Sequence, residues 1–178
     1  MRPQLEVVLR RSFDGGAWHG PSLRDALADV DAAAALARPV PAAHNIWELT
    51  HHLMAWTREV TRRLETGRAA MPIEGDWPGP VTESDAAARD AAWAWLRASL
   101  DEARDALLGA LGTFPVERLD ERVTSLDGEG VPGGYVTFRQ MVIGLAEHNA
   151  YHGGQVVLLK RALAVAPPPR DASAITES

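Results

Sequence analysis

Residues 138–163, FRQMVIGLAEHNAYHGGQVVLLKRAL, carry the pattern that decides the fold. Their apolar positions alternate at intervals of four and three residues, which is the a/d spacing of a helix facing the interior of a bundle. Thr137 and Gln140 form a capping-box pair, so we expect this helix to begin at Thr137 and to reach about Leu163. The seam consists of Phe138, Val142, Leu145, Asn149, His152, Val156, Leu159 and Leu163.

The rest of the chain also has the periodicity of helices, and its strand signal is poor. Helices joined by short or medium connections predict an all-α, antiparallel four-helix bundle with long connecting loops. We expect one domain over residues 1–165 and a disordered tail over residues 166–178. The expected helices are 3–13, 22–38, 44–65 and 84–111, with one extra turn at 115–119 and long loops at 68–81 and 123–135.

Composition excludes several classes of protein. The chain has 178 residues, of which 46% are hydrophobic, and its formal net charge of −6 argues against nucleic acid or an anionic membrane as a partner. No apolar run approaches the roughly 18 residues of a membrane span, and no signal peptide is evident, so we expect a cytoplasmic protein. The absence of cysteine excludes disulfides and thiolate nucleophiles.

Two polar layers interrupt the seam of the last helix. Asn149 and His152 occupy consecutive seam positions, and burying such groups without partners costs on the order of 1–3 kcal/mol each. His148 lies four residues before His152, so the two imidazoles project from one face, the spacing by which a helix presents two nitrogens to one metal ion. This pair alone is a weak signal, because surface or hydrogen-bonded core histidines also show it.

A third ligand would have to come from another helix. In HNIWELTHHLMAW, residues 44–56, the seam includes Leu49, then His52 or Leu53, then Trp56, which makes His52 the inward histidine. His51 falls about 100° to one side, at a helix boundary or in solvent. An inward histidine on a second helix favours a metal site between the two helices.

The remaining polar residues have two interpretations each. Gln155 either donates a hydrogen bond that supports His152 or is a helix-surface glutamine. Asn149 is our candidate for a catalytic proton partner because it shares the seam. His19 lies in a loop that could cover the open end of the bundle as a proton shuttle or a fourth ligand. We favour structural roles for the others: surface ion pairs for Glu48 and Glu147, packing for Tyr151, and the start of a helix for His44.

Four stretches together resemble the DinB-like (YfiT-type) superfamily of metal-binding four-helix bundles, and the resemblance covers most of residues 5–163. It implies that the second and third helices of the bundle run in the same sense and that the protein is a homodimer. It also implies a divalent ion, zinc or nickel, on His52, His148 and His152, the first because it stands six positions after Ile46. The stretches are GGAWHGPSL (15–23), HNIWELTHHLMAWTREVTRRLETG (44–67), EGDWP (74–78) and EHNAYHGGQVVLLKRAL (147–163).

The same resemblance carries expectations about chemistry. Some relatives are transferases or isomerases that use low-molecular-weight thiols such as bacillithiol or mycothiol. Three neutral imidazoles leave a metal position open for water or a thiol. We therefore predict a metal-dependent hydrolase or thiol S-transferase that acts on a small-molecule electrophile. The alternative is a non-catalytic metal-binding stress-response protein in which the ion and the dimer are structural.

Overall fold

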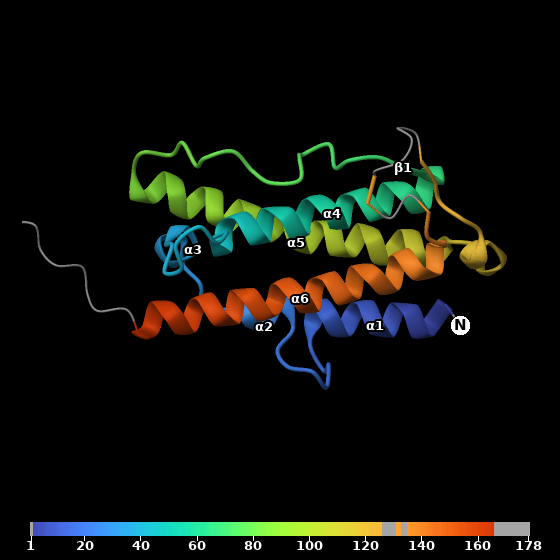
Figure 1. Cartoon of the computed structure of the whole chain (residues 1–178), viewed down its shortest axis with the longest axis horizontal. Coiled ribbons are helices and arrows are strands. Elements are labelled where there is room, and N and C mark those ends of the chain that lie inside the picture. The colour runs from blue at the N-terminus through green and yellow to red at the C-terminus, as the bar shows by residue number, and fades with distance from the viewer. Residues whose placement is uncertain (1, 126–130, 133–134, 166–178) are drawn as a thin grey trace, which may run out of the picture.

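Four long helices build the molecule (Figure 1). The computed structural model describes residues 2–125, 131–132 and 135–165, so the predicted disordered tail at 166–178 lies outside the described residues. The all-α bundle is confirmed. Within the described part of the chain, no helix combines the length and apolar composition that crossing a bilayer requires. The long helices are α1 (Arg2–Asp14), α4 (Ile46–Thr66), α5 (Ala86–Thr113) and α6 (Phe138–Val165).

The helices run in two parallel pairs. Figure 1 shows α4 beside α5 in one direction and α1 beside α6 in the other. The connection from residue 67 to residue 85 crosses the length of the bundle. Extended chain covers about 3.3 Å per residue, enough to return past a helix of 21 residues, which is roughly 32 Å long. The antiparallel arrangement predicted from connection lengths is therefore wrong for α4 and α5, whereas the resemblance implied their orientation correctly.

The seam of α6 faces the core as the spacing predicts. Its apolar members from Phe138 to Leu159 are buried, and Leu163 is half-buried against the same core. The two polar layers are also inside, with Asn149 1% and His152 7% exposed. The predicted capping box is present: the Thr137 amide donates to Gln140 Oε1 at 3.0 Å, and the Gln140 amide donates to Thr137 Oγ1 at 3.2 Å.

Helix α4 begins two residues later than predicted. The side chain of Asn45 accepts a hydrogen bond from the Glu48 amide, and Glu48 reciprocates, which completes a capping box. His44 therefore lies just outside the helix. At the other end Gly67 adopts φ +75°, the left-handed conformation that glycine reaches without a Cβ penalty, and it ends the helix where the sequence predicts.

The single helix expected over residues 22–38 is wrong. The segment forms two short helices, α2 (Leu23–Leu27) and α3 (Ala32–Leu36), capped by Ser22 and Asp31 respectively. The Asp31 carboxylate accepts from the Ala34 amide at 2.7 Å, an alternative to continuing the first helix. The freed carbonyl of Val30 accepts a hydrogen bond from the indole of Trp93 on α5 at 2.8 Å.

A short parallel pairing, absent from the sequence-based prediction, ties two loops together. Strand β1 (Arg68–Ala69) pairs with β2 (Thr124–Ser125). A 3₁₀ helix, η1 (Val116–Asp120), forms where one extra turn is expected. These elements sit at one end of the bundle, where α4 ends and α6 begins (Figure 1).

A buried ion pair on α4 holds this end. Arg63 donates to Glu59 Oε1 at 2.7 Å, and both side chains are almost fully buried. The guanidinium also donates to the carbonyls of Ala70 and Pro132, at 2.8 and 2.7 Å. One charged side chain thus links α4 to the segments that follow it and that precede α6.

Candidate metal centre

Three histidines from two helices converge between α4 and α6. His52 projects from α4, and His148 and His152 project from consecutive turns of α6. The ring centroids of His52 lie 4.9 Å from those of both partners, and the centroids of His148 and His152 are 4.5 Å apart. The structure therefore brings together the three residues that the sequence predicts as ligands.

Their nitrogen atoms are close enough to share one ion. His52 Nε2 and His148 Nε2 lie 2.9 Å apart, and one nitrogen from each of the three rings falls within 4.8 Å of the others. Three nitrogens at about 2.0–2.1 Å from one tetrahedral ion would be roughly 3.3 Å from one another. The three nitrogens fit one divalent ion after small movements that bring each nitrogen–nitrogen distance, at most 4.8 Å here, to about this value.

Hydrogen bonds at the other ring nitrogen orient two of the rings. His52 Nδ1 lies 2.8 Å from the Asp76 carbonyl oxygen, and His152 Nδ1 lies 2.7 Å from Gln155 Oε1. A carbonyl oxygen can only accept, so His52 Nδ1 carries the proton. The amide oxygen of Gln155 also accepts, which places the proton of His152 on its Nδ1. Each Nε2 then presents its lone pair to the cluster, the arrangement that supports metal ligation.

The third ring is held differently. His148 Nδ1 is buried and has no hydrogen-bond partner among the described residues. Since His52 Nε2 can only accept, the proton of a neutral His148 lies at Nε2 when the rings contact each other directly. A metal ion in its place would remove this need for one imidazole to donate to another.

Burial keeps all three imidazoles neutral. It is the main cause that lowers the pKa of His148 to about 3, with the neighbouring His152 and His52 adding to the effect. Burial also lowers the pKa values of His52 and His152, while Asp76 and Gln155 respectively oppose the shift. Neutral imidazole is the form that binds metal, so this environment favours ligation at neutral pH.

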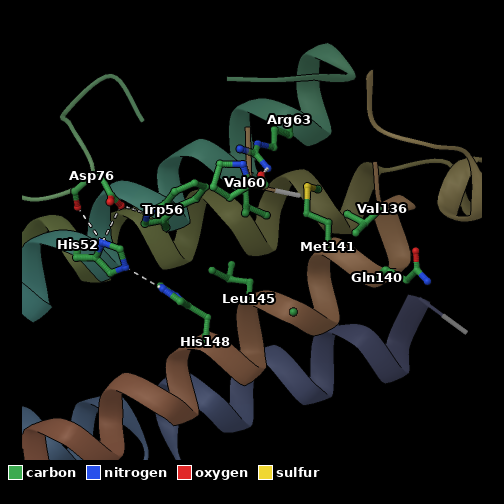
Figure 2. Close-up of a pocket in the computed structure, with 12 residues that line it drawn as sticks. His52, Trp56, Val60, Arg63, Asp76, Val136, Gln140, Met141, Leu145 and His148 are labelled. Atoms are coloured by element: carbon green, nitrogen blue, oxygen red, sulfur yellow. Dashed lines mark hydrogen bonds and ion pairs between the residues drawn. The ribbon is translucent and has the colours of Figure 1, made fainter. Parts of the chain in front are cut away.

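The loop between α4 and α5 covers the His52 side of the cluster. The Trp77 ring stacks between His44 and His52, with centroid distances of 3.6 and 4.0 Å and nearly parallel planes. Asp76 Oδ1 accepts from the Trp56 indole at 2.7 Å and lies 3.1 Å from His52 Nδ1 (Figure 2). These contacts fix the loop and, through it, the orientation of His52.

Sequence reasoning missed Asp76 and Trp77 as parts of the site. Both lie in EGDWP, a stretch that contributes to the family resemblance, but residues 24 or more positions from a ligand show no periodic relation to it. The length of the loop was the available signal, because loops of that size are often functional.

A cavity of about 410 Å³ opens beside the histidines (Figure 2). His52 and His148 lie at one end of it, and Arg63 and Gln140 lie toward the other. The volume falls in the range of about 300–1,000 Å³ that small-molecule sites occupy. Its remaining described lining consists of Trp56, Val60, Asp76, Pro132, Val136, Met141, Gly144 and Leu145.

The two predicted catalytic residues lie elsewhere. Asn149 turns toward α1, where its Nδ2 donates to Ser12 Oγ at 3.1 Å, because its position on α6 is about 100° from that of His148. His19 is exposed and lines a separate groove between α1 and α6, in the loop that Figure 1 shows on the side of these helices away from α4. Neither side chain joins the histidine cluster.

The other polar candidates have structural contacts. Glu48 belongs to the capping box, pairs with Arg38 and accepts a hydrogen bond from His44 Nδ1 at 3.1 Å, so it is not free to act as a base. His51 is half-buried rather than in solvent. Tyr151 is 65% exposed, with its ring edge against His152, which agrees with a packing role at the rim.

Gln155 proves to be a hydrogen-bond partner of a predicted ligand rather than a free surface residue. It contacts His152 through its oxygen, so it acts as an acceptor and not as the donor that the sequence suggested. The reason is the i, i+3 spacing on one helix, which brings the two side chains together.

A sequence model of the DinB superfamily matches residues 17–156, a range that contains the EGDWP loop and all three histidines. This chain belongs to the DinB superfamily. No curated protein and no solved structure matches it. DinB-like proteins bind metal ions, and this member has three adjacent histidines that could hold one. Imidazole donors suit zinc, nickel, copper and iron alike, so the donor set does not select among these metals.

Proposed function

We propose that the protein binds one divalent metal ion, zinc or nickel, through His52, His148 and His152 and uses it in nucleophilic chemistry on a small electrophile. The reaction is hydrolysis or transfer of a low-molecular-weight thiol of the bacillithiol or mycothiol type. The observation that carries the proposal is the pair of Nδ1 hydrogen bonds, from His52 and His152, which turns both Nε2 lone pairs toward one point beside an open cavity.

The ion, when bound by three neutral histidines, would keep its charge and an open position, and would lower the pKa of a water or a thiol there. The protein's residues supply the setting. Asp76 and Gln155 orient two of the proposed ligands, Trp77 shields one face of His52, and apolar side chains line the cavity beside them. Since the chain has no cysteine, a thiol nucleophile must come from a cosubstrate.

The partners follow from the same proposal. A net charge of −6 favours a small molecule over nucleic acid. Homodimerisation and a cytoplasmic location stay predictions, and sedimentation equilibrium of the purified protein tests the dimer.

Metal uptake is the first test. Protein stripped with a chelator and dialysed against Zn²⁺ or Ni²⁺ should retain one ion per chain by elemental analysis. His52→Ala should lower the affinity by at least tenfold, because it leaves two ligands. His51→Ala is the matched control, since it removes the neighbouring imidazole from the same helix without touching the cluster. If His52→Ala binds the metal ion as tightly as the unchanged protein does, the proposed site is wrong.

The reaction is tested on Co²⁺-loaded protein. Titration with a low-molecular-weight thiol should produce a thiolate-to-cobalt absorption band if the open position accepts thiols, and ester hydrolysis without such a band would select the hydrolase. Stoichiometric metal with neither property would favour the non-catalytic alternative, in which the ion ties α4 to α6.

A further inference from the structure

We propose that the substrate of this site has an apolar body and a single polar reacting head. The head lies at the histidines, and the body, aliphatic or aromatic, lies along the cavity between α4 and α6. The inference rests on the proposed function for the head and on the cavity wall for the body.

The wall between the two ends of the cavity is built from apolar side chains on facing helices. After His52, the inward positions of α4 are Trp56 and Val60, and α6 contributes Met141 and Leu145 before His148. These residues continue the intervals of three and four that place the ligands inside the bundle, so each helix lines the cavity with one stripe. Figure 2 shows the four side chains between the histidines and Arg63.

The protein itself engages part of the hydrogen-bonding capacity of the polar groups at the far end. Arg63 donates to Glu59, Ala70 and Pro132, and its charge is balanced by the buried Glu59 carboxylate. Gln140 is committed to the capping box of α6 through its Oε1. A polar substrate group placed against the apolar wall between the two ends would lose water without gaining a partner, at a cost of roughly 1–3 kcal/mol.

The near end has the opposite character. His52, His148 and Asp76 line this region, and a bound ion would add a position for one polar atom. The cavity therefore separates one polar anchoring point from an apolar wall, and this division selects amphiphilic small molecules over sugars or other substrates that are polar throughout.

Gly144 offers a way to fill the cavity without touching a ligand. It lines the cavity on α6, and a Cβ added to it would meet no heavy atom within 4 Å. Gly144→Leu should therefore place an isobutyl group in the space that the substrate body would take. Gly109→Leu is the matched control, because Gly109 is a helical glycine of α5 with equally open surroundings and is not among the residues that line this cavity.

The experiment measures binding of metal-chelating hydroxamates to the zinc-loaded full-length protein by calorimetry. Acetohydroxamate reports on the head alone, hexanohydroxamate adds an apolar body, and 6-hydroxyhexanohydroxamate adds a body with a polar end. We expect each buried methylene to tighten binding about two- to fourfold, and the terminal hydroxyl to reverse much of that gain. Gly144→Leu should abolish the chain-length effect and leave acetohydroxamate binding unchanged, whereas Gly109→Leu should behave like the unchanged protein.

The outcomes separate the two proposals. Acetohydroxamate binding with no gain from the longer chain of hexanohydroxamate, or with no loss from the terminal hydroxyl, overturns the inference about the body and leaves the metal site standing. Failure to bind zinc or acetohydroxamate overturns the proposed function, and this inference with it. The ligand series on the unchanged protein decides the question even if a variant does not fold.

Discussion

Gln155→Leu removes the acceptor that orients His152 and should weaken metal binding. The Gln155 oxygen lies 2.7 Å from His152 Nδ1, and its loss leaves a buried N–H without this partner. The ring can then favour the other tautomer, with the proton on Nε2, which cannot ligate. Loss of such a supporting bond typically costs 10–100-fold in metal affinity, or about 1.4–2.8 kcal/mol.

The assay is competition for Zn²⁺ against a chromophoric chelator at constant pH. Leucine and glutamine have similar helix propensities, so a loss of unfolding free energy in the metal-free protein, of about 1–3 kcal/mol at most, would come from the buried His152 N–H that loses its acceptor. Gln155→Glu is the matched variant, because it keeps an acceptor oxygen and should retain or raise the affinity. An affinity of Gln155→Leu within twofold of the unchanged protein would refute the argument that Gln155 fixes the tautomer.

Three further predictions concern burial, the loop and the ion pair. Burial lowers the pKa of His148 below its unfolded value, so the unfolded state binds more protons between about pH 3 and 6.5. The metal-free protein should therefore lose roughly 1–2 kcal/mol of stability when the pH falls from 7.5 to 5, measured by urea titration. A urea midpoint that does not change with pH would contradict this. Trp77→Ala removes the ring stacked on His52, and should weaken zinc binding several-fold and speed proteolysis between α4 and α5, whereas unchanged cleavage rates would show that the stack does not hold the loop. Arg63→Met removes the guanidinium that bonds Glu59 and two carbonyl groups, while Glu59 keeps its ion pair with Arg62, so the protein should lose about 1–3 kcal/mol of stability in urea denaturation. The double variant that also carries Glu59→Leu should recover part of this loss.

The cluster of three histidines could be predicted because local periodicity carries it. The a/d intervals of α6 placed His152 inside, the i, i+4 spacing placed His148 on the same face, and the seam of α4 made His52 the inward histidine. Capping signals at Thr137 and Gly67 likewise depend on neighbours a few positions away, and the helix ends predicted from them are correct to within two residues.

The proton partners could not be predicted in the same way. Asn149 shares the seam with His152, but it follows His148 by one residue and therefore points about 100° away from it, toward Ser12 on α1. Both directions lie inside the bundle because α6 packs against α1 as well as α4. Asp76 supports His52 from a loop, and that contact depends on how residues 67–85 cross the bundle.

The sequence by itself determined an all-helical chain with an inward face on each long helix and three histidines on two of those faces. Such features arise from intervals of three and four residues along one helix, where the geometry is fixed by the backbone. Only the tertiary structure decided that α4 and α5 run parallel, that Asp76 and Trp77 close over His52, and that an apolar cavity adjoins the cluster. Those features depend on the path of loops and on contacts between residues far apart in the chain, for which local periodicity holds no information.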